Sequence, residues 1–509
     1  MLLIFPPVAK ACEPPAGLAR LSGMLSFYDI QHDILDANIE GLLYILEQKI
    51  PQEKLTDVWS KSAFQNIKKN MDSLKSTFAY ENKDRYIKTI RDITHILGIL
   101  SPKGCKIGLA DYSQENLSPT KTTNLNLVAR EPEKNPFYPY FSDRVREYIA
   151  RKNIHLVGIS LNYLSQALCS FSMAGFIRKE FPHLKIIMGG GLITSWIKKL
   201  KASDCFSWLV DSFIDGPGER ALQELAGVTK NKRMFFLPDY SRLPLNSYLS
   251  PGLILPYSTS SGCYWRNCDF CPEKAQKTVY HPVPISQTLK EIQHLNEKFQ
   301  PVLIHFLDNA ISPALLKSFS AQTPRRPWYG FTRIIKELAN LDFCKHLRNT
   351  GCIMLKLGIE SGDQEVLDRL HKGIDLKIVS LALQNLRKAG IATYVYLLFG
   401  TPVETKKSAY KTWEFTARHS DCIQFLNLAI FNMPVDGEEF LSLEKKPFSL
   451  DDLSLYTDFV HPDGWDRKNI RLFLDREFKR DAEIARILQN DPPVFTSNHA
   501  AFMIKNSLA

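Results

Sequence analysis

Three cysteines near the middle of the chain stand close enough together to bind one metal centre. Cys263, Cys268 and Cys271 lie within nine residues, directly after an apolar run at 255–259 that predicts a buried strand. A loop that leaves a strand can curl three sulfur atoms toward a common point. Thiolates bind iron–sulfur clusters and zinc, so this loop is the strongest candidate for chemistry in the chain.

The spacing favours a [4Fe–4S] cluster over zinc. Such a cluster has four irons, so three thiolates leave one iron open, and an open iron can chelate the amino and carboxylate groups of S-adenosylmethionine (SAM). A structural zinc site, the alternative, needs a fourth ligand at short spacing, whereas His281 and His294 are isolated and no second CxxC follows. Phe270, just before the last cysteine, could shield the cluster and lie beside the adenine.

Apolar segments that alternate with helical ones predict the scaffold that positions this loop. Six strand–helix steps indicate a partial (β/α)6 barrel of the TIM type, whose reactive loops lie at the carboxyl ends of the strands. The six strands are expected at 255–259, 303–307, 328–332, 352–358, 392–399 and 423–430.

The cysteine loop and the residues after each strand, taken in order, resemble the radical SAM superfamily over about 250–435. The superfamily's usual signature has three residues between its first two cysteines, and this chain has four. The resemblance implies that Cys263, Cys268 and Cys271 hold a [4Fe–4S] cluster. It also implies that SAM contacts Phe270, Asp308, Arg333, Glu360, Ser361 and Gly400, with Arg333 facing the SAM carboxylate. The segments that carry it are 261–271, 305–310, 332–333, 357–362 with 372–373, and 398–405.

The part of the chain before the barrel predicts a second α/β domain. Strands expected at 2–5, 156–161, 185–188 and 208–214 alternate with helices, which indicates a doubly wound, Rossmann-like parallel sheet. The expected organisation is an α/β domain at 1–235 with a helical insertion at about 37–150, a linker at 236–253, the barrel at 254–440, and a mostly helical region at 441–509 without a motif.

This first domain resembles the cobalamin-binding domain of cobalamin-dependent radical SAM enzymes. The resemblance is carried by the segments 5–21, 34–38, 157–166, 188–194 and 215–219. The D-x-H-x-x-G motif, whose histidine ligates cobalt in other cobalamin proteins, is absent, and we interpret His32 as structural; the radical SAM branch commonly binds cobalamin without that ligand. The cobalamin contacts that the resemblance implies are Ser160, Ser165, Gln166, Gly189, Gly190, Gly191, Thr194, Gly216, Gly218 and Glu219.

Together the two resemblances imply a cobalamin-dependent radical SAM methyltransferase. It would methylate an unactivated carbon of a small molecule or peptide through a 5′-deoxyadenosyl radical and methylcobalamin, with a flavodoxin- or ferredoxin-type electron donor. One alternative keeps the cofactors but catalyses cyclisation, ring contraction or oxidation. Another is a non-enzymatic protein that binds cobalamin or metal.

Bulk properties exclude some other classes. The net charge of +10 over 509 residues comes without long basic runs, so nucleic acid is not an expected partner. No stretch of about twenty apolar residues predicts a membrane span. The apolar N-terminus breaks at Pro6 and Pro7 and lacks a preceding basic region, so it reads as a strand rather than a signal peptide, and we expect a cytoplasmic protein with reduced cysteines.

Overall fold

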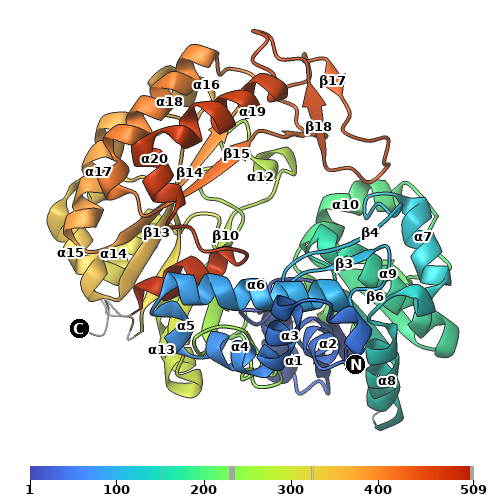
Figure 1. Ribbon diagram of the computed structural model, residues 1–509. Coiled ribbons are helices and arrows are strands. Elements are labelled where there is room, and N and C mark those ends of the chain that lie inside the picture. Colours follow the sequence, from blue (N-terminus) through green and yellow to red (C-terminus); the bar gives the residue numbers. More distant parts are fainter. Residues whose placement is uncertain (152, 229–234, 322–323, 325, 505–509) are drawn as a thin grey trace. The chain divides into compact units, whose positions relative to one another are not determined.

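The computed structural model describes residues 1–509 except 152, 229–234, 322–323, 325 and 505–509 (Figure 1). The chain divides into two compact units. Unit 1 comprises Met1–Leu253, Leu450–Ser454 and Pro493–Phe495, and unit 2 comprises Ile254–Ser449, Leu455–Pro492 and Thr496–Ala509. Each unit is built around its own parallel sheet, so each is described by itself.

Unit 1 contains the expected doubly wound sheet. Its five parallel strands run in the order β2-β1-β5-β6-β7, and the helices α1 (Ala16–Phe27), α9 (Leu164–Glu180), α10 (Gly191–Lys201) and α11 (Gly218–Leu225) follow strands of this sheet. Because the chain leaves β1 toward β2 and returns to β5 on the other side, the sheet has a switch point between β1 and β5. The strands are β1 (Leu2–Phe5), β2 (Asp33–Asp36), β5 (Leu156–Ser160), β6 (Lys185–Gly189) and β7 (Ser212–Phe213).

The last strand is shorter than the expected 208–214. The amide groups of Leu209 and Val210 both donate to the carbonyl of Phe206, so this part forms a turn instead of pairing with β6. Leu209 and Val210 are nevertheless buried, whereas Trp208 is 39% exposed. The apolar run therefore marked the burial of two residues here but not the strand boundary.

Helices fill most of the chain between β2 and β5. Asp36 caps the first of them by accepting hydrogen bonds from the amides of Asn38 and Ile39. Gly175 of α9 lets α7 pack closely, since a Cβ there would lie 1.8 Å from the carbonyl oxygen of Ala129. The elements are α2 (Ala37–Leu46), α3 (Val58–Gln65), α4 (Ile67–Leu74), α5 (Thr77–Tyr80), α6 (Lys83–Leu100), the hairpin β3 (Cys105–Ile107) and β4 (Tyr112–Gln114), α7 (Thr122–Arg130) and α8 (Tyr138–Arg151).

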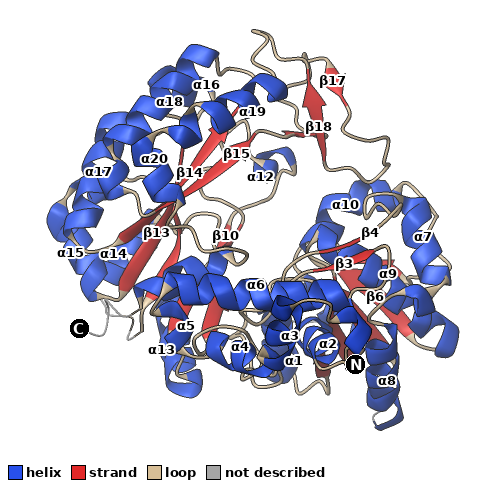
Figure 2. Ribbon diagram, viewed as in Figure 1, coloured by secondary structure: helices blue, strands red, loops and turns tan. Residues whose placement is uncertain are grey.

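Unit 2 contains the expected partial barrel. Six parallel strands run in the order β15-β14-β13-β12-β11-β8, and Figure 2 shows helices along the outer side of this curved sheet. The strands are β8 (Ile254–Tyr257), β11 (Leu303–Phe306), β12 (Trp328–Thr332), β13 (Cys352–Glu360), β14 (Ala392–Phe399) and β15 (Phe425–Ile430). The helices are α13 (Ile285–Phe299), α14 (Pro313–Ala321), α15 (Leu341–Asn349), α16 (Gln364–Arg369), α17 (Leu376–Lys388) and α18 (Lys406–Arg418).

After the barrel, the chain combines helices with a small antiparallel sheet. The strands β16 (Met433–Pro434), β18 (Tyr456–Phe459) and β17 (Lys445–Lys446) pair in that order, and α19 (Arg467–Arg476) and α20 (Ala482–Leu488) follow. Two-residue strands have no alternating pattern that a sequence could reveal. No helix in the described part of the chain has the length and hydropathy needed to cross a membrane.

Candidate active site

The three cysteines lie on one loop at the carboxyl end of β8. The loop begins with β9 (Ser260–Ser261) and Gly262 and ends at α12 (Pro272–Ala275). Gly262 has a φ of +72°, and a Cβ there would lie 2.7 Å from the carbonyl oxygen of Val279, so glycine is required. Cys268 is buried, whereas Cys263 and Cys271 are half-buried. The loop thus leaves the barrel sheet at the end where barrel enzymes place their reactive groups.

The thiols of this loop interact with one another and with nearby cations. Burial raises the pKa of Cys271 to about 11, and the neighbouring Cys268 and Cys263 add to the increase. Burial also raises the pKa of Cys268, although Lys372 and Arg333 oppose it. Within the described residues, no three His, Cys, Asp or Glu side chains are already disposed around a common point as metal ligands. The fit to a cluster therefore rests on the donor chemistry: three thiols on one loop, faced by two cations.

Arg333, immediately after β12, joins three segments at this loop. Its Nη1 donates to the Sγ of Cys268 at 3.6 Å, and its Nη2 donates to the carbonyl of Lys372. The guanidinium also lies over the ring of Trp265, 4.3 Å from the centroid. Arg333 is only 7% exposed. Its contact with the SAM carboxylate stays a prediction, while its contact with the cysteine loop is direct.

The segment after α16 also packs onto the cysteine loop. Lys372 Nζ lies 2.8 Å from Glu360 Oε1 and 5.5 Å from the centroid of the Phe270 ring. Gly373 has a φ of +66°, and a Cβ there would lie 2.1 Å from the ring of Trp265. The structure therefore brings Glu360 and Phe270 together through Lys372. Lys372 lies in the segment 372–373 that carries the resemblance, but the sequence analysis assigned it no role.

Asp308, after β11, is already occupied by the start of the cysteine loop. Its carboxylate accepts hydrogen bonds from the amide of Thr259 at 3.0 Å, from the Thr259 hydroxyl at 2.7 Å and from the Ser260 hydroxyl at 2.5 Å. It is 2% exposed, and burial raises its pKa. Asp308 consequently fixes the position of the residues between β8 and the cysteine loop. Its contact with SAM stays a prediction.

Ser361 and Gly400 also make contacts within the barrel. The Ser361 hydroxyl lies 3.2 Å from that of Thr412 in α18 and accepts from the amide of Asp363 at 3.1 Å. Gly400 has a φ of +77°, and its amide donates to Glu404 Oε2 at 2.5 Å. Both residues hold loops at the carboxyl ends of β13 and β14, the same end as the cysteine loop.

In unit 1, two predicted contact residues connect α9 to the loop after β1. Gln166 is fully buried; its Nε2 donates to the carbonyl of Pro6 at 2.7 Å, and its Oε1 accepts from the amides of Asn162 and Tyr163. The Ser165 hydroxyl donates to the carbonyl of Val8 at 2.8 Å. These side chains shape the carboxyl edge of β1 and β5, where doubly wound sheets bind ligands.

Glycines line the same edge after β6. Gly190 has a φ of +108°, and a Cβ there would lie 2.5 Å from the carbonyl oxygen of Leu161. The amide of Gly191 donates to Asn162 Oδ1 at 3.0 Å, which joins this turn to the end of β5 next to Ser160. Gly189 ends β6 and Gly191 begins α10. Because these three residues carry no side chains, a large planar ligand can approach their backbone.

The remaining predicted contacts lie in α10 and after β7. The Thr194 hydroxyl donates to the carbonyl of Gly190 at 3.1 Å and accepts from the amide of Gly216 at 3.0 Å. Gly218 begins α11, and Glu219 forms a 2.8 Å ion pair with Arg20 of α1. Thr194 thus connects the turns after β6 and β7, and the carboxylate of Glu219 is already paired.

His32 is engaged inside unit 1. Its Nε2 lies 2.8 Å from the hydroxyl of Ser22, and its Nδ1 lies 2.8 Å from the carbonyl oxygen of Ile30. The ring is 1% exposed, and burial lowers its pKa. Both ring nitrogens are used, which agrees with its interpretation as a structural residue.

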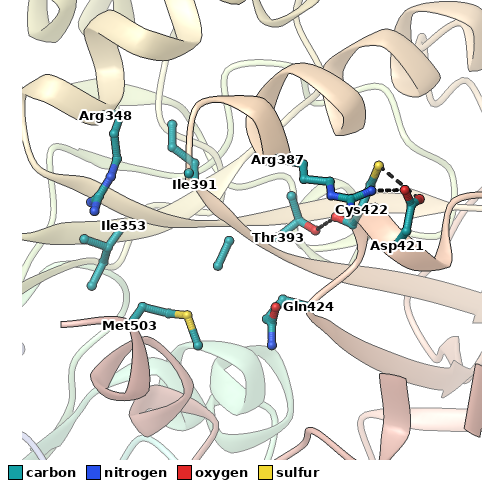
Figure 3. A pocket seen from close by; sticks show the side chains of 11 residues that line it. Arg348, Ile353, Arg387, Ile391, Thr393, Asp421, Cys422, Gln424 and Met503 are labelled. Atoms are coloured by element: carbon teal, nitrogen blue, oxygen red, sulfur yellow. Dashed lines mark hydrogen bonds and ion pairs between the residues drawn. The ribbon is translucent and has the colours of Figure 1, made fainter. Parts of the chain in front are cut away.

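A cavity of about 180 Å³ lies at the opposite end of the barrel strands (Figure 3). Arg387 is paired with Asp421 there, and the Thr393 hydroxyl donates to the carbonyl of Cys422 at 2.6 Å. The cavity lies beside the amino ends of β13, β14 and β15, whereas barrel chemistry takes place at the carboxyl ends. None of the residues that the sequence nominated for a site lines it. Its other labelled side chains are Arg348, Ile353, Ile391, Gln424 and Met503.

Comparisons with known proteins agree with this arrangement. The family model "Radical SAM superfamily" matches residues 257–415. An uncharacterized methyltransferase of Pyrococcus horikoshii is 21% identical over 317 residues, which cover 55% of this chain and 67% of the relative. Residues 257–415 are therefore a radical SAM domain.

Two solved structures share the fold of the chain. The radical SAM methyltransferase TsrM from Kitasatospora setae, with tryptophan substrate and a SAM analogue bound, matches with a TM-score of 0.54 at 14% identity, covering 98% of this chain and 89% of that one. The cobalamin-dependent SAM radical enzyme OxsB, with aqua-cobalamin bound, matches with a TM-score of 0.56 at 13% identity, covering 93% of this chain and 66% of that one. At these identities the likeness establishes the fold alone.

Proposed function

We propose, on the basis of the radical SAM domain at 257–415, that this chain is a cobalamin-dependent radical SAM methyltransferase. Its cofactors would be a [4Fe–4S] cluster, SAM and cobalamin. Its substrate would be a small molecule or peptide methylated on an unactivated carbon. The observation that carries the proposal is the convergence of Cys268, Arg333 and Lys372 at the carboxyl end of the barrel.

The thiolates of Cys263, Cys268 and Cys271 would hold the cluster. A reduced cluster bound there would supply the electron that cleaves SAM into methionine and a 5′-deoxyadenosyl radical, which is able to abstract hydrogen from carbon. The chain's own contribution is electrostatic and steric. Lys372 and Arg333 favour the thiolate form of Cys268 against burial, and the rings of Phe270 and Trp265 cover these cations and limit the access of water.

Residues 1–235 would bind cobalamin at the carboxyl edge of β1, β5 and β6. The glycines at 189–191 add no side chains of their own to this edge, and Gln166 and Ser165 hold the two loops that border it. Because both nitrogens of His32 are engaged, we infer that His32 does not ligate cobalt from below. The insertion at about 37–150 would cover the corrin or shape the entry of the substrate.

The experiment uses the full chain, reconstituted anaerobically with iron and sulfide and supplied with cobalamin, SAM and a strong reductant. Bound iron, bound cobalamin, 5′-deoxyadenosine and S-adenosylhomocysteine are quantified. The test variant combines Cys263→Ala, Cys268→Ala and Cys271→Ala. The matched control combines Cys105→Ala, Cys205→Ala and Cys422→Ala, which removes three thiols outside the loop.

We expect about four irons per chain and 5′-deoxyadenosine from the wild type and the control, and neither from the test variant. S-adenosylhomocysteine together with bound cobalamin would support methyl transfer. 5′-Deoxyadenosine without S-adenosylhomocysteine would favour cyclisation, ring contraction or oxidation. Zinc in place of iron, with intact SAM, would overturn the enzymatic proposal.

A further inference from the structure

The loop that follows β14 is held by the C-terminal region of the same unit. A Cβ on Gly400 would lie 2.3 Å from Cδ1 of Ile470 in α19, so the loop backbone and this helix are in close contact. His461 Nε2 lies 3.0 Å from the carbonyl oxygen of Thr401. We call residues 461–470 the latch. The latch therefore reaches the loop at two consecutive residues directly after the strand.

Glu404 connects the latch to the loop through a single oxygen. Its Oε2 accepts from the amide of Gly400 at 2.5 Å and from Nε1 of Trp465 at 3.0 Å. The residue is 1% exposed, and its Oε1 is buried without a hydrogen-bond partner among the described residues. Burial raises the pKa of Glu404 to about 7, although the hydrogen bonds from Gly400 and Trp465 oppose the increase.

A carboxyl group in such a place is unfavourable for stability alone. The unpartnered Oε1 costs free energy, which the two hydrogen bonds accepted by Oε2 offset only in part. What Glu404 provides instead is a fixed distance between the first residue after β14 and an indole of the latch. Gly400, which it holds, is one of the residues expected to contact SAM.

We propose that Glu404 is a positioning residue that, together with Trp465, holds the loop 400–405 in the position needed for contact with SAM, so that the latch completes the SAM site. The inference rests on the proposed function, because it assigns the loop to SAM. It gives a role to a C-terminal segment in which the sequence shows no motif. Neither Glu404 nor Trp465 needs to touch SAM.

Two substitutions at Glu404 distinguish the effect of its hydrogen-bond acceptor on SAM binding from the effect of its charge. Glu404→Ala leaves the amide of Gly400 and the indole of Trp465 without their acceptor, so we expect the dissociation constant for SAM to rise about tenfold. Glu404→Gln keeps an acceptor oxygen and should restore binding to within about twofold of the wild type. Trp465→Phe removes one donor and should give a smaller rise, about threefold. The double variant Glu404→Ala/Trp465→Phe should bind no more weakly than Glu404→Ala, because both changes break one interaction.

Trp413 provides a matched control. Its Nε1 donates to Asp481 Oδ2 at 3.1 Å, which is the same indole–carboxylate bond made between α18 and the start of α20. This bond does not involve the loop 400–405. Trp413→Phe should therefore lower stability by a similar amount as Trp465→Phe and leave SAM binding unchanged.

Two measurements test the proposal on the full chain. Hydrogen exchange without cofactors should become faster at 400–405 and 461–470 in Glu404→Ala, and stay as in the wild type at both segments in Trp413→Phe. Equilibrium dialysis of SAM with the cluster-reconstituted protein gives the dissociation constants. Turnover to 5′-deoxyadenosine should show the change in KM for SAM, with kcat within about twofold.

The outcomes distinguish this inference from the proposed function. If the wild type binds SAM, and Glu404→Ala and Trp465→Phe bind it as tightly as the wild type does, the positioning role is wrong and the proposed function stands. A Trp413→Phe variant that loses SAM binding as Trp465→Phe does would also overturn it. If the wild type binds no SAM and retains zinc, the proposed function fails and this inference fails with it. Should Glu404→Ala not fold, Trp465→Phe and Glu404→Gln carry the test.

Discussion

Nη1 of Arg333 donates to the Sγ of Cys268 across 3.6 Å, which joins the third strand of the barrel directly to the cysteine loop. The same guanidinium donates to the carbonyl of Lys372 and lies over the ring of Trp265. A planar group with several donors can make these contacts simultaneously, whereas an ammonium group cannot. Arg333 therefore sets the position of the cysteine loop as well as the charge around it.

Replacement of Arg333 should reduce the ability of the loop to retain iron. We expect Arg333→Ala to bind less than about half of the wild-type iron after reconstitution, because Cys268 loses a cation that favours its thiolate. Arg333→Lys should bind an intermediate amount, since it keeps the charge but not the fork of donors. Iron and sulfide analysis measures both. Arg387→Ala, at the far end of the strands, serves as control, and full iron in Arg333→Ala would contradict the role.

Gly373→Ala should displace the cysteine loop through Trp265. The substitution combines a φ of +66° with a Cβ placed 2.1 Å from the Trp265 ring. Gly390→Ala is the matched control, because Gly390 has a φ of +72° but its Cβ would meet only Arg348 Nε at 3.7 Å. Both variants should lose about 1 kcal/mol of stability from the backbone, but only Gly373→Ala should also lose iron. Equal iron contents in the two variants would show that the Trp265 contact is unimportant.

The sequence predicted the barrel well because buried parallel strands appear as apolar runs. The expected segments 328–332 and 392–399 coincide with β12 (Trp328–Thr332) and β14 (Ala392–Phe399). The expected 208–214 contains only the two-residue β7 (Ser212–Phe213), since Leu209 and Val210 belong to a turn before it. Periodicity reports which residues are buried, whereas hydrogen bonding decides which of them form a strand.

At the site, the sequence indicated positions but not pairings. Asp308 bonds Thr259, and Arg333 bonds Cys268, over sequence separations of 49 and 65 residues. Nothing in local spacing links such partners. The latch is harder still to predict, because Trp465 contributes a single N–H donor and shares no motif with Glu404. The predicted cluster and cofactor contacts themselves stay predictions.

Gly190→Ala should weaken the binding of cobalamin. Gly190 has a φ of +108°, and its Cβ would lie 2.5 Å from the carbonyl oxygen of Leu161, so the turn after β6 must move away from β5. We expect the dissociation constant for cobalamin to rise about tenfold, measured by equilibrium dialysis with spectroscopic detection. Gly227→Ala, with a φ of +77° and open space around its Cβ, should bind as the wild type does. Unchanged binding in Gly190→Ala would exclude this turn from the cobalamin site.

Asp36→Asn should stabilise unit 1 at high pH and not at low pH. Asp36 Oδ1 accepts from the amides of Asn38 and Ile39, and Oδ2 accepts from the Tyr248 hydroxyl at 2.6 Å. Burial raises the pKa of Asp36 from 3.8 to about 6. Between these two values the folded chain still holds a proton that the unfolded chain has lost. The stabilisation by this group is thus complete below about pH 4 and is lost as the pH rises through about 6.

Asparagine keeps an acceptor for the helix cap and is neutral at every pH. The difference in the free energy of unfolding between Asp36→Asn and the wild type should therefore be larger at about pH 8 than at about pH 4. Its upper limit is about 3 kcal/mol, from a shift of about two pKa units. Asp57, which caps α3 through the amide of Ser60 at 2.7 Å, is a control of opposite sign, because that hydrogen bond lowers its pKa. Asp57 contributes stability above its ordinary pKa, so Asp57→Asn should be neutral or destabilising at about pH 8. Calorimetry measures the stability of each variant at both pH values. A stability difference between Asp36→Asn and the wild type that does not change with pH would mean that Asp36 is not buried as a charged group.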